Sequence, residues 1–433
     1  MKKFRIIGGR QLKGELRVQG AKNEALQVIC ACALTEDTVT LNNVPYIQDV
    51  KGLFDILDYL GADVNFPGQG VWKVACKDLD LGLTDTDKYR KMSGSLRGSV
   101  MLAGSMLGRY KRAVIWQPGG DKIGRRRLDT HLLGFEALGA KIEYDSLKGC
   151  WLLDGSAMHG SYVLLQEASV TGTANVVMAA VLTEGVTEIF NAACEPYVVG
   201  LCRLLVNMGA KIEGIGSNLL RIEGVKTLHG AEHTMEADMI EVGSFIGMAA
   251  MTSSVIMLKD LDKKSLGIIP SVFEGLGIKM SYAGKDLQIN GQGEYFLGSN
   301  LDGSMKVISD APWPGFSPDL LSIVLAVGLL GQGSIMIHQK MFESRLYFTD
   351  KLIAMGGRII LCDPHRAVVI GGGKGSLRGV NMTSPDIRAG IAMLLSAMSA
   401  KGVSEISNIE QIERGYEDID VRLNALGADI ERI

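Results

Sequence analysis

Six copies of one short phrase divide the chain into similar parts. In each copy a glycine ends an amphipathic stretch, and the residues after the glycine alternate in polarity. The shared glycines are Gly61, Gly139, Gly209, Gly277, Gly356 and Gly427, separated by 78, 70, 68, 79 and 71 residues. A repeat of this length predicts six related supersecondary units.

Each phrase predicts the end of a surface helix and the start of a strand. In the first copy, Leu53, Ile56 and Leu60 have the i, i+3, i+7 spacing of a helix that covers a sheet. The glycine after them can take the left-handed conformation that ends many helices. More uniformly apolar stretches lie upstream, such as 320–330, which precedes a strand at 334–338. We therefore expect an α/β chain with a buried helix, a strand, a surface helix, a strand and a hairpin in each unit.

The length of 433 residues corresponds to two or three domains of ordinary size. Units of about 70 residues are longer than most solenoid repeats, which have about 20–45. Three units in each of two similar domains fit the length, with the boundary near residues 236–241.

Charge and composition exclude several classes of protein. The chain carries 45 Lys and Arg against 48 Asp and Glu, a net charge of −3, which argues against nucleic-acid binding by bulk positive charge. Its seven cysteines form no C-x-x-C pair, as expected for reduced thiols. The longest apolar run, 320–330, is too short to span a bilayer, and the first residues do not resemble a signal peptide. We expect a cytoplasmic protein with no membrane or nucleic-acid partner. Its oligomeric state stays open, and a monomer is compatible with the sequence.

Cations stand at the starts of three expected buried helices, at Lys22, Arg97 and Arg388. The helix dipole favours negative charge in the first turn, so a cation there works against local stability. Three such positions in equivalent repeats favour a site for bound anions, with solvated surface cations as the alternative. Asp238 begins another of these helices, Asp386 begins the helix that carries Arg388, and both are explained by ordinary capping.

A loop rich in glycine and cations, 118–129, lies between an expected strand and a helix that begins near Asp129. Lys122 and three consecutive arginines from Arg125 suit it to holding phosphate or carboxylate. Its glycine spacing imitates a P-loop, but Arg125 and Arg126 replace the Lys-Ser/Thr pair that such a loop requires.

Arg345 and Arg414 each stand after an expected strand and before a surface helix. Ion pairing with the neighbouring glutamates, Glu343 and Glu413, is the alternative to a binding role. No histidine and cysteine cluster has the spacing of metal ligands, so no metal is expected.

Six motifs carry a family resemblance. They are Gly8-Gly9-x-x-Leu12-x-Gly14-Glu15-x-x-Val18-x-Gly20-Ala21-Lys22-Asn23, the Pro118-Gly119-Gly120 arginine loop, Pro314-Gly315-Phe316-x-x-Asp319, Phe342-Glu343-x-Arg345, Asp386-x-Arg388-Ala389 and Arg414-Gly415-Tyr416-Glu417. Over essentially its whole length, the chain resembles the UDP-N-acetylglucosamine enolpyruvyl transferases (1-carboxyvinyltransferases), which open peptidoglycan precursor synthesis.

The resemblance implies a two-domain inside-out α/β barrel with six βαββ-containing repeats, three per domain. Residues 22–236 would form the N-terminal domain, with a mobile catalytic loop at 117–128. Residues 1–21 together with 237–433 would form the C-terminal domain. In that fold the buried helices of both domains aim their N-termini at a cleft where two anionic substrates bind.

The resemblance also implies a reaction between phosphoenolpyruvate and UDP-N-acetylglucosamine that gives the 3-O-enolpyruvyl sugar nucleotide and phosphate. The sugar 3-hydroxyl adds to C2 while C3 takes a proton, and the tetrahedral ketal then loses a C3 proton and phosphate. This chemistry needs a base, an acid, and groups that stabilise phosphate and carboxylate. No metal or organic cofactor is implied.

Matching the motifs position by position implies the site residues. Asp319 would hold or deprotonate the sugar hydroxyl, and Asp121 would deliver the proton. The residues with a catalytic role are Asp121, Asp319, Lys22 and Arg414. The residues at phosphoenolpyruvate are Lys22, Asn23, Arg126, Arg345, Arg388 and Arg414. The residues at UDP-N-acetylglucosamine are Asn23, Arg97, Arg126, Asp129, Ser169, Val170, Thr171, Asp319 and Met341.

Two other functions stay open. The sister family that makes 5-enolpyruvylshikimate 3-phosphate shares the fold and the chemistry. Its first helix usually begins Gly-Ser-Lys-Ser, where this chain has Gly20-Ala21-Lys22-Asn23. The second alternative is a catalytically silent paralogue that binds nucleotide sugars, since one acid residue is exchanged.

Two departures from the family pattern bear on function. Asp121 stands where many members have a loop cysteine, as it does in a recognised subset of the family. Glu167 puts a negative charge where a lysine often faces the diphosphate, which would move the diphosphate contacts to Arg125 or Arg127.

We predict an active enzyme that is insensitive to fosfomycin, the epoxide antibiotic that alkylates the loop cysteine in that family. A carboxylate is a poor nucleophile compared with a thiolate. Phosphate release by the unaltered protein should be unchanged after incubation with fosfomycin. An Asp121→Cys variant should lose activity in the same incubation. Covalent inactivation of the unaltered protein would contradict the prediction.

Overall fold

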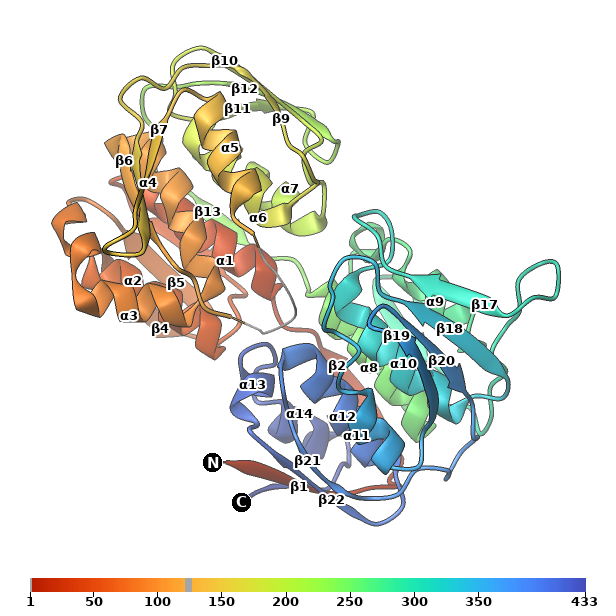
Figure 1. Cartoon of the computed structure of the whole chain (residues 1–433). Coiled ribbons are helices and arrows are strands. Elements are labelled where there is room, and N and C mark those ends of the chain that lie inside the picture. Colours follow the sequence, from red (N-terminus) through yellow and green to blue (C-terminus); the bar gives the residue numbers. More distant parts are fainter. Residues whose placement is uncertain (1, 121–126) are drawn as a thin grey trace. The chain divides into compact units, whose positions relative to one another are not determined.

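The computed structural model describes residues 2–120 and 127–433 (Figure 1). Two of the expected site residues, Asp121 and Arg126, therefore lie outside the described part of the chain. The chain divides into two compact units, which we treat separately. The N-terminal unit contains Gly20–Gly120 and the described residues from there to Glu236, and the C-terminal unit contains the described residues up to Gln19 together with Ala237–Ile433.

The N-terminal unit contains three repeats, each with a buried helix, a strand, a surface helix and further strands. The first repeat has α1 (Lys22–Ala31), η1 (Cys32–Leu34), β3 (Val39–Asn42), α2 (Gln48–Tyr59), β4 (Asp63–Gly68) and β5 (Val71–Ala75). The second has η2 (Leu81–Asp85), α3 (Asp87–Ser95), η3 (Arg97–Met101), α4 (Leu102–Tyr110), β6 (Arg112–Trp116), α5 (Asp129–Ala137), β7 (Lys141–Asp145), β8 (Cys150–Asp154) and β9 (Tyr162–Leu164). The third has α6 (Val170–Ala180), β10 (Val186–Phe190), α7 (Pro196–Asn207), β11 (Lys211–Glu213), β12 (Leu219–Glu223) and β13 (Glu232–Thr234).

The C-terminal unit repeats the same order. The fourth repeat has α8 (Met239–Thr252), β14 (Val255–Lys259), η4 (Lys263–Leu266), α9 (Ile269–Glu274), β15 (Met280–Ala283), β16 (Asp286–Ile289) and β17 (Lys306–Ser309). The fifth has η5 (Pro318–Leu320), α10 (Leu321–Leu330), β18 (Ser334–His338), α11 (Thr349–Ala354), β19 (Arg358–Asp363), β20 (Arg366–Ile370) and β21 (Asn381–Thr383). The sixth has α12 (Ile387–Ser399), β22 (Val403–Ser407), α13 (Glu410–Glu413), α14 (Ile419–Ala425) and β23 (Ile430–Arg432), completed by β1 (Lys3–Ile7) and β2 (Lys13–Arg17).

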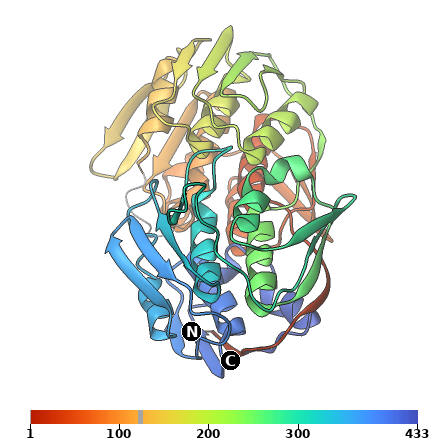
Figure 2. The same ribbon diagram turned by 90° about the vertical axis from the view of Figure 1, so that its right-hand side faces the viewer.

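Strands exchanged between repeats hold each unit together. β13, at the end of the third repeat, pairs in parallel with β3 of the first, and β2 pairs in parallel with β14 of the fourth. β1 lies between β22 and β23, so both ends of the chain share one sheet, as Figure 2 shows. The sheet orders are β13-β3-β5-β4, β6-β8-β7, β11-β12-β10-β9, β15-β16-β14-β2, β17-β18-β20-β19 and β21-β22-β1-β23.

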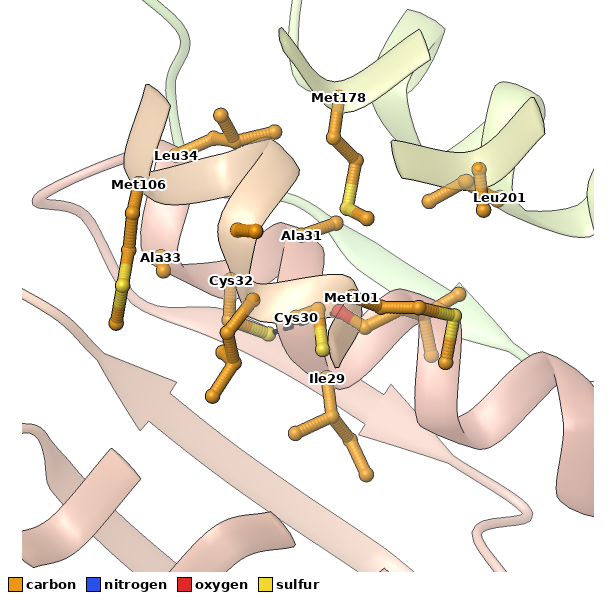
Figure 3. Close-up of a cluster of buried hydrophobic side chains, with 14 of the residues drawn as sticks. Ile29, Cys30, Ala31, Cys32, Ala33, Leu34, Met101, Met106, Met178 and Leu201 are labelled. Carbon is orange, nitrogen blue, oxygen red and sulfur yellow. Dashed lines mark hydrogen bonds between the residues drawn. The ribbon is translucent and has the colours of Figure 1, made fainter. Parts of the chain in front are cut away.

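The buried helices of the N-terminal unit run parallel. Leu26 of α1 faces Gly98 of η3, and the carbonyl of Cys30 accepts a hydrogen bond from Ser105 of α4. Residue numbers rise together on the two sides of this contact, so α1 is parallel to η3 and α4. The contacts between α4 and α6 follow the same rule. Figure 3 shows the core that results, with apolar side chains of α1 and its neighbours in contact.

The buried helices of the C-terminal unit pack by the same rule. Gly243 and Gly247 of α8 face Leu320 and Ile323, so α8 and α10 are parallel. A hydroxyl in the first turn of α10 donates to a carbonyl at the start of α12. The three helices lie side by side in both views (Figures 1 and 2). In each unit, three helix N-termini therefore point the same way.

Several expectations from the sequence are confirmed. All six shared glycines have a positive φ, between 83° and 104°. β18 has the predicted bounds, and α10 lies within the predicted 320–330. Asp238 and Asp386 accept hydrogen bonds from backbone N–H groups of α8 and α12, as caps should. As a separate finding, no helix among the described residues is both long enough and apolar enough to cross a bilayer.

Two alanine substitutions in one helix test the role of its terminal glycine. Gly61 follows α2 at φ +103°, where an L residue costs about 1–2 kcal/mol. Gly52 lies inside α2 with open space where a Cβ would stand, so alanine there should stabilise by about 0.5–1 kcal/mol. Urea denaturation should show Gly61→Ala less stable and Gly52→Ala more stable than the unaltered protein. Shifts of the same sign would contradict this account.

Candidate functional site

Asp319 lies between two arginines just before α10. Its Oδ1 accepts a hydrogen bond from Arg345 Nη2 at 2.5 Å, and its Oδ2 accepts from Arg388 Nε and Nη2 at 3.0 and 2.8 Å. The side chains of Arg345 and Arg388 are 9% and 8% exposed. We call these three residues the carboxylate–arginine cluster. Its two cations and one anion leave one positive formal charge, which favours a negatively charged ligand.

Local structure fixes two members of the cluster. Arg388 is the second residue of α12, and the Asp386 carboxylate accepts hydrogen bonds from the N–H groups of Arg388 and Ala389 at 2.8 and 2.9 Å. The N–H of Asp319 donates to the hydroxyl of Ser317 at 3.3 Å. Each charged side chain is thus attached to a capped helix start.

Arg345 retains unused donors. It belongs to the connection between β18 and α11, and its guanidinium lies over the ring of Phe342 at 5.0 Å. Its Nε and Nη1 are buried, and neither donates to any described residue. Buried donors without partners are costly, so an acceptor supplied by a ligand would remove that cost. The alternative that Arg345 merely pairs with Glu343 is wrong, because its carboxylate partner is Asp319.

Tyr416 supports the cluster from the side. Its hydroxyl is 2.8 Å from Ser244 Oγ and 3.5 Å from Arg388 Nη1. Burial raises the pKa of Tyr416 to about 12, although Arg388 acts in the opposite direction. The phenol therefore stays protonated at neutral pH. Arg414 stands two residues earlier and donates to Gln411 Oε1 at 3.0 Å.

In the N-terminal unit, Lys22 opens α1 and pairs with a carboxylate. Its Nζ is 2.6 Å from Asp49 Oδ2 in the first turn of α2, and the two side chains are 7% and 10% exposed. Sequence reasoning missed Asp49, because the two positions are joined only by the packing of α1 on α2. Asn23, the next residue of α1, is half-buried.

The starts of η3, α5 and α6 also lie together. His131 Nδ1 accepts a hydrogen bond from Asn175 Nδ2 at 2.7 Å, and its Nε2 lies 3.2 Å from Thr171 Oγ1. Arg97 Nη2 donates to the carbonyl of Arg127 at 3.1 Å. The structure therefore links helix starts that carry expected sugar-nucleotide residues, through a histidine that sequence reasoning missed.

The other expected sugar-nucleotide residues have simple settings. Asp129 is exposed at the start of α5, and Val170 is half-buried at the start of α6. Ser169 caps α6 by accepting from the N–H of Gly172 at 3.1 Å. Glu167, the departure noted in the sequence, accepts from the hydroxyl of Thr130 at 3.1 Å.

Two buried glutamates hold the chain segments that join the units. Glu24 and Glu241 are each the third residue of a buried helix, α1 and α8. Glu24 is 2.7 Å from His233 Nε2 and accepts from the N–H of Glu236 at 3.4 Å. Burial raises the pKa of both glutamates.

The second glutamate uses equivalent contacts. Glu241 accepts hydrogen bonds from Arg422 at 2.6 and 3.0 Å and from the N–H of Gln19 at 2.8 Å. Each glutamate thus binds the segment that enters or leaves its own unit. These contacts brace the backbone beside Lys22 and beside the start of α8. The sequence gives no local sign of them.

No metal centre is visible in this arrangement. Within the ranges 2–120 and 127–433, no group of three or more His, Cys, Asp and Glu side chains is placed to hold a metal ion. The chemistry that the described residues offer is recognition of anions by buried arginines and a lysine, with carboxylates as proton acceptors.

Comparisons with known proteins give a consistent result. The model of the family described as EPSP synthase (3-phosphoshikimate 1-carboxyvinyltransferase) matches residues 6–423. The chain is 57% identical over 434 residues to the UDP-N-acetylglucosamine 1-carboxyvinyltransferase of Bacteroides thetaiotaomicron, with all of both chains covered.

Solved structures share the fold at low sequence identity. The enolpyruvyl transferase NikO from Streptomyces tendae has a TM-score of 0.87 and 20% identity, with 100% of this chain and 99% of that chain covered. EPSP synthase from Acinetobacter baumannii has a TM-score of 0.73 and 17% identity, with 100% of both chains covered. The expected two-domain inside-out α/β barrel is confirmed by these neighbours.

His131 should make stability depend on pH. Burial lowers the pKa of His131 to about 3, and Arg97 adds to the shift. An unfolded histidine takes up its proton near pH ~6.5, so below that pH the unfolded state binds more protons than the folded one. Stability should therefore fall as the pH falls, with a contribution of about 2 kcal/mol lost by pH 5.

Urea denaturation at pH 7, 6 and 5 tests this linkage. His131→Asn should reduce the slope of unfolding free energy against pH, even though it also lowers stability at pH 7. Ile29→Val, a core substitution without a titrating group, should lower stability equally at each pH. An unchanged slope in His131→Asn would rule out this source of pH dependence.

Proposed function

Because the chain belongs to the UDP-N-acetylglucosamine 1-carboxyvinyltransferase family, we propose that it transfers the enolpyruvyl group of phosphoenolpyruvate to the 3-hydroxyl of UDP-N-acetylglucosamine and releases phosphate. This is the first committed step of peptidoglycan biosynthesis. The observation that carries the proposal is the carboxylate–arginine cluster. It offers a proton acceptor and buried cations at one point, which an addition to an anionic enol ester requires.

In this proposal the C-terminal unit supplies the base and the arginines that bind the substrate carboxylate. Asp319 takes the proton of the sugar hydroxyl as that oxygen adds to C2. Arg345 and Arg388 hold the carboxylate of phosphoenolpyruvate and of the tetrahedral ketal. The unused donors of Arg345 support this role, since they suit a second carboxylate besides Asp319. Arg414 assists at the phosphate and Met341 lines the sugar-nucleotide pocket.

The N-terminal unit supplies residues that bind the phosphate of phosphoenolpyruvate. Lys22 contacts the phosphate of phosphoenolpyruvate, with Asp49 fixing its ammonium group until the substrate binds. Asn23 contacts both substrates. The side chains proposed for UDP-N-acetylglucosamine in this unit are Arg97, Asp129, Ser169, Val170 and Thr171. Three parallel helix N-termini support anion binding at this end of the unit.

Two residues of the segment 117–128, both outside the described residues, complete the proposal. Asp121 gives a proton to C3 during addition and takes one back during elimination. Arg126 joins Lys22 at the phosphate. We also propose that 22–236 and 1–21 with 237–433 act as the two domains of the enzyme, a division that the two compact units support.

The cytoplasm is the proposed compartment. All seven cysteines are free thiols, and free thiols persist where the environment is reducing. Both proposed substrates are small molecules, and a monomer suffices for the proposed chemistry.

Two alternatives have specific grounds. The family model carries the EPSP synthase description, which keeps 3-phosphoshikimate as a possible acceptor. The exchange of the loop cysteine for Asp121 leaves the second alternative open, a catalytically silent paralogue that binds nucleotide sugars. The 57% identity to a UDP-N-acetylglucosamine enzyme favours the proposed function over both.

Phosphate release tests the proposal. Phosphoenolpyruvate with UDP-N-acetylglucosamine should give phosphate and an enolpyruvyl sugar nucleotide by mass spectrometry, whereas shikimate 3-phosphate should give neither. Asp319→Asn should lower kcat by about 100-fold or more, since it removes the proton acceptor. Asp302→Asn, which changes an exposed carboxylate before β17, is the matched control and should retain full activity.

The opposite outcomes separate the alternatives. Turnover of shikimate 3-phosphate would establish the sister activity. Tight binding of UDP-N-acetylglucosamine without phosphate release would establish the silent paralogue.

A further inference from the structure

Asp310 is a buried carboxylate that the proposed chemistry does not use. It directly follows β17 and is 0% exposed. β17 and β18 pair in parallel, with Ser309 opposite His338, so Asp310 and Gln339 leave the sheet side by side. Parallel strands that end together bring the connections after them to one edge of the sheet.

The carboxylate of Asp310 binds the second of these connections. It accepts hydrogen bonds from the side-chain amide of Gln339, from the N–H of Lys340 at 2.5 Å and from the N–H of Met341 at 3.1 Å. These three donors carry no formal charge. A fully buried carboxylate is retained at a cost, and backbone N–H donors offset that cost only while the segment keeps this conformation.

The same two connections meet again further along. Residues 311–318 lead from Asp310 to Asp319, and 342–344 lead from Met341 to Arg345. The Asp319–Arg345 ion pair joins the far ends of the two connections. We call this closed arrangement of 310–319 and 339–345 the frame. Two carboxylates thus tie the connections together, Asp310 at the sheet and Asp319 in the site.

Arg345 depends on this frame for its orientation. Among the described residues, its only hydrogen bond goes to Asp319, and its Nε and Nη1 are buried without acceptors. Asp319 and the Phe342 ring contact this guanidinium, and its position also depends on the backbone that carries Arg345. The backbone that carries it is held to the sheet by Asp310.

We propose that Asp310 is a positioning residue, which fixes the segment 339–345 and so directs Arg345 and Met341 toward the substrates. The proposal rests on the function proposed above. Asp310 touches no reacting atom and acts through the two side chains that its segment carries.

Kinetics of Asp310→Asn give the first test. An amide cannot accept from all three donors, so the segment should shift and kcat/KM for phosphoenolpyruvate should fall about 10- to 100-fold. KM for UDP-N-acetylglucosamine should also rise, because Met341 moves with the segment. Asp310→Ser keeps one acceptor, provides a second variant if the first does not fold, and should lose less. Ile335→Val in β18 is the control for lost stability alone, and it should leave both constants within twofold.

A double-mutant cycle separates positioning from general destabilisation. If Asp310 acts through Arg345, Asp310→Asn should cost several-fold less in an Arg345→Lys background than in the unaltered protein. In a Lys22→Gln background its effect should multiply in full, because Lys22 belongs to the other unit.

The outcomes distinguish this proposal from the proposed function. Full turnover by the unaltered protein, with Asp310 variants that lose thermal stability but match Ile335→Val in kinetics, would overturn the positioning role alone. The positioning role would also be overturned if the effects of Asp310→Asn and Arg345→Lys on kcat/KM multiplied in full in the double variant. If the unaltered protein shows no turnover, the proposed function fails. In that case the positioning role of Asp310 is tested by calorimetry, which gives the dissociation constant for UDP-N-acetylglucosamine in Asp310→Asn and Ile335→Val. Equal constants in the two variants, or no binding, would overturn the positioning role.

Discussion

The parallel packing of three apolar helices in each unit is the constraint on which the rest of the structure depends. Helices that are apolar on nearly all sides must be covered on all sides, and here the sheets of three repeats provide that cover. Parallel packing brings three positive helix ends together at one end of each unit. Glycines such as Gly98 and Gly243 permit the close approach. The way the core is built therefore favours negative charge at that end of each unit.

Cations at these helix starts would destabilise the protein if nothing balanced them. The chain balances them with carboxylates from distant positions: Asp49 for Lys22, and Asp319 for Arg388. Removing one partner of a buried pair costs about 3–5 kcal/mol, so these pairs hold the cations in fixed places. The sequence suggested that bound anions make up the loss. The structure adds that protein carboxylates already do so.

Buried carboxylates that accept backbone N–H groups recur outside the cluster. Glu24 and Glu241 hold the segments that join the units, and Asp310 holds the connection that carries Arg345. Each carboxylate replaces the hydration that a buried N–H has lost. These segments lie outside the named helices and strands, so few backbone hydrogen bonds fix them, such as those from the N–H groups of Ala21 and Asp238. A carboxylate from elsewhere in the chain adds the further hydrogen bonds that hold each segment in place.

The sequence by itself determined the features that depend on neighbours along the chain. Six glycines at regular steps gave the repeats and the helix ends, and apolar spacing gave α10 and the strand after it, because backbone conformation and side-chain periodicity are local. The motifs gave the family and the expected site residues. Only the tertiary structure decided which strand completes which sheet, as with β13 beside β3, and which carboxylate meets which cation. Asp49, His131 and Asp310 carry no local signal, because their partners lie many residues away and are brought to them only when the helices and sheets pack.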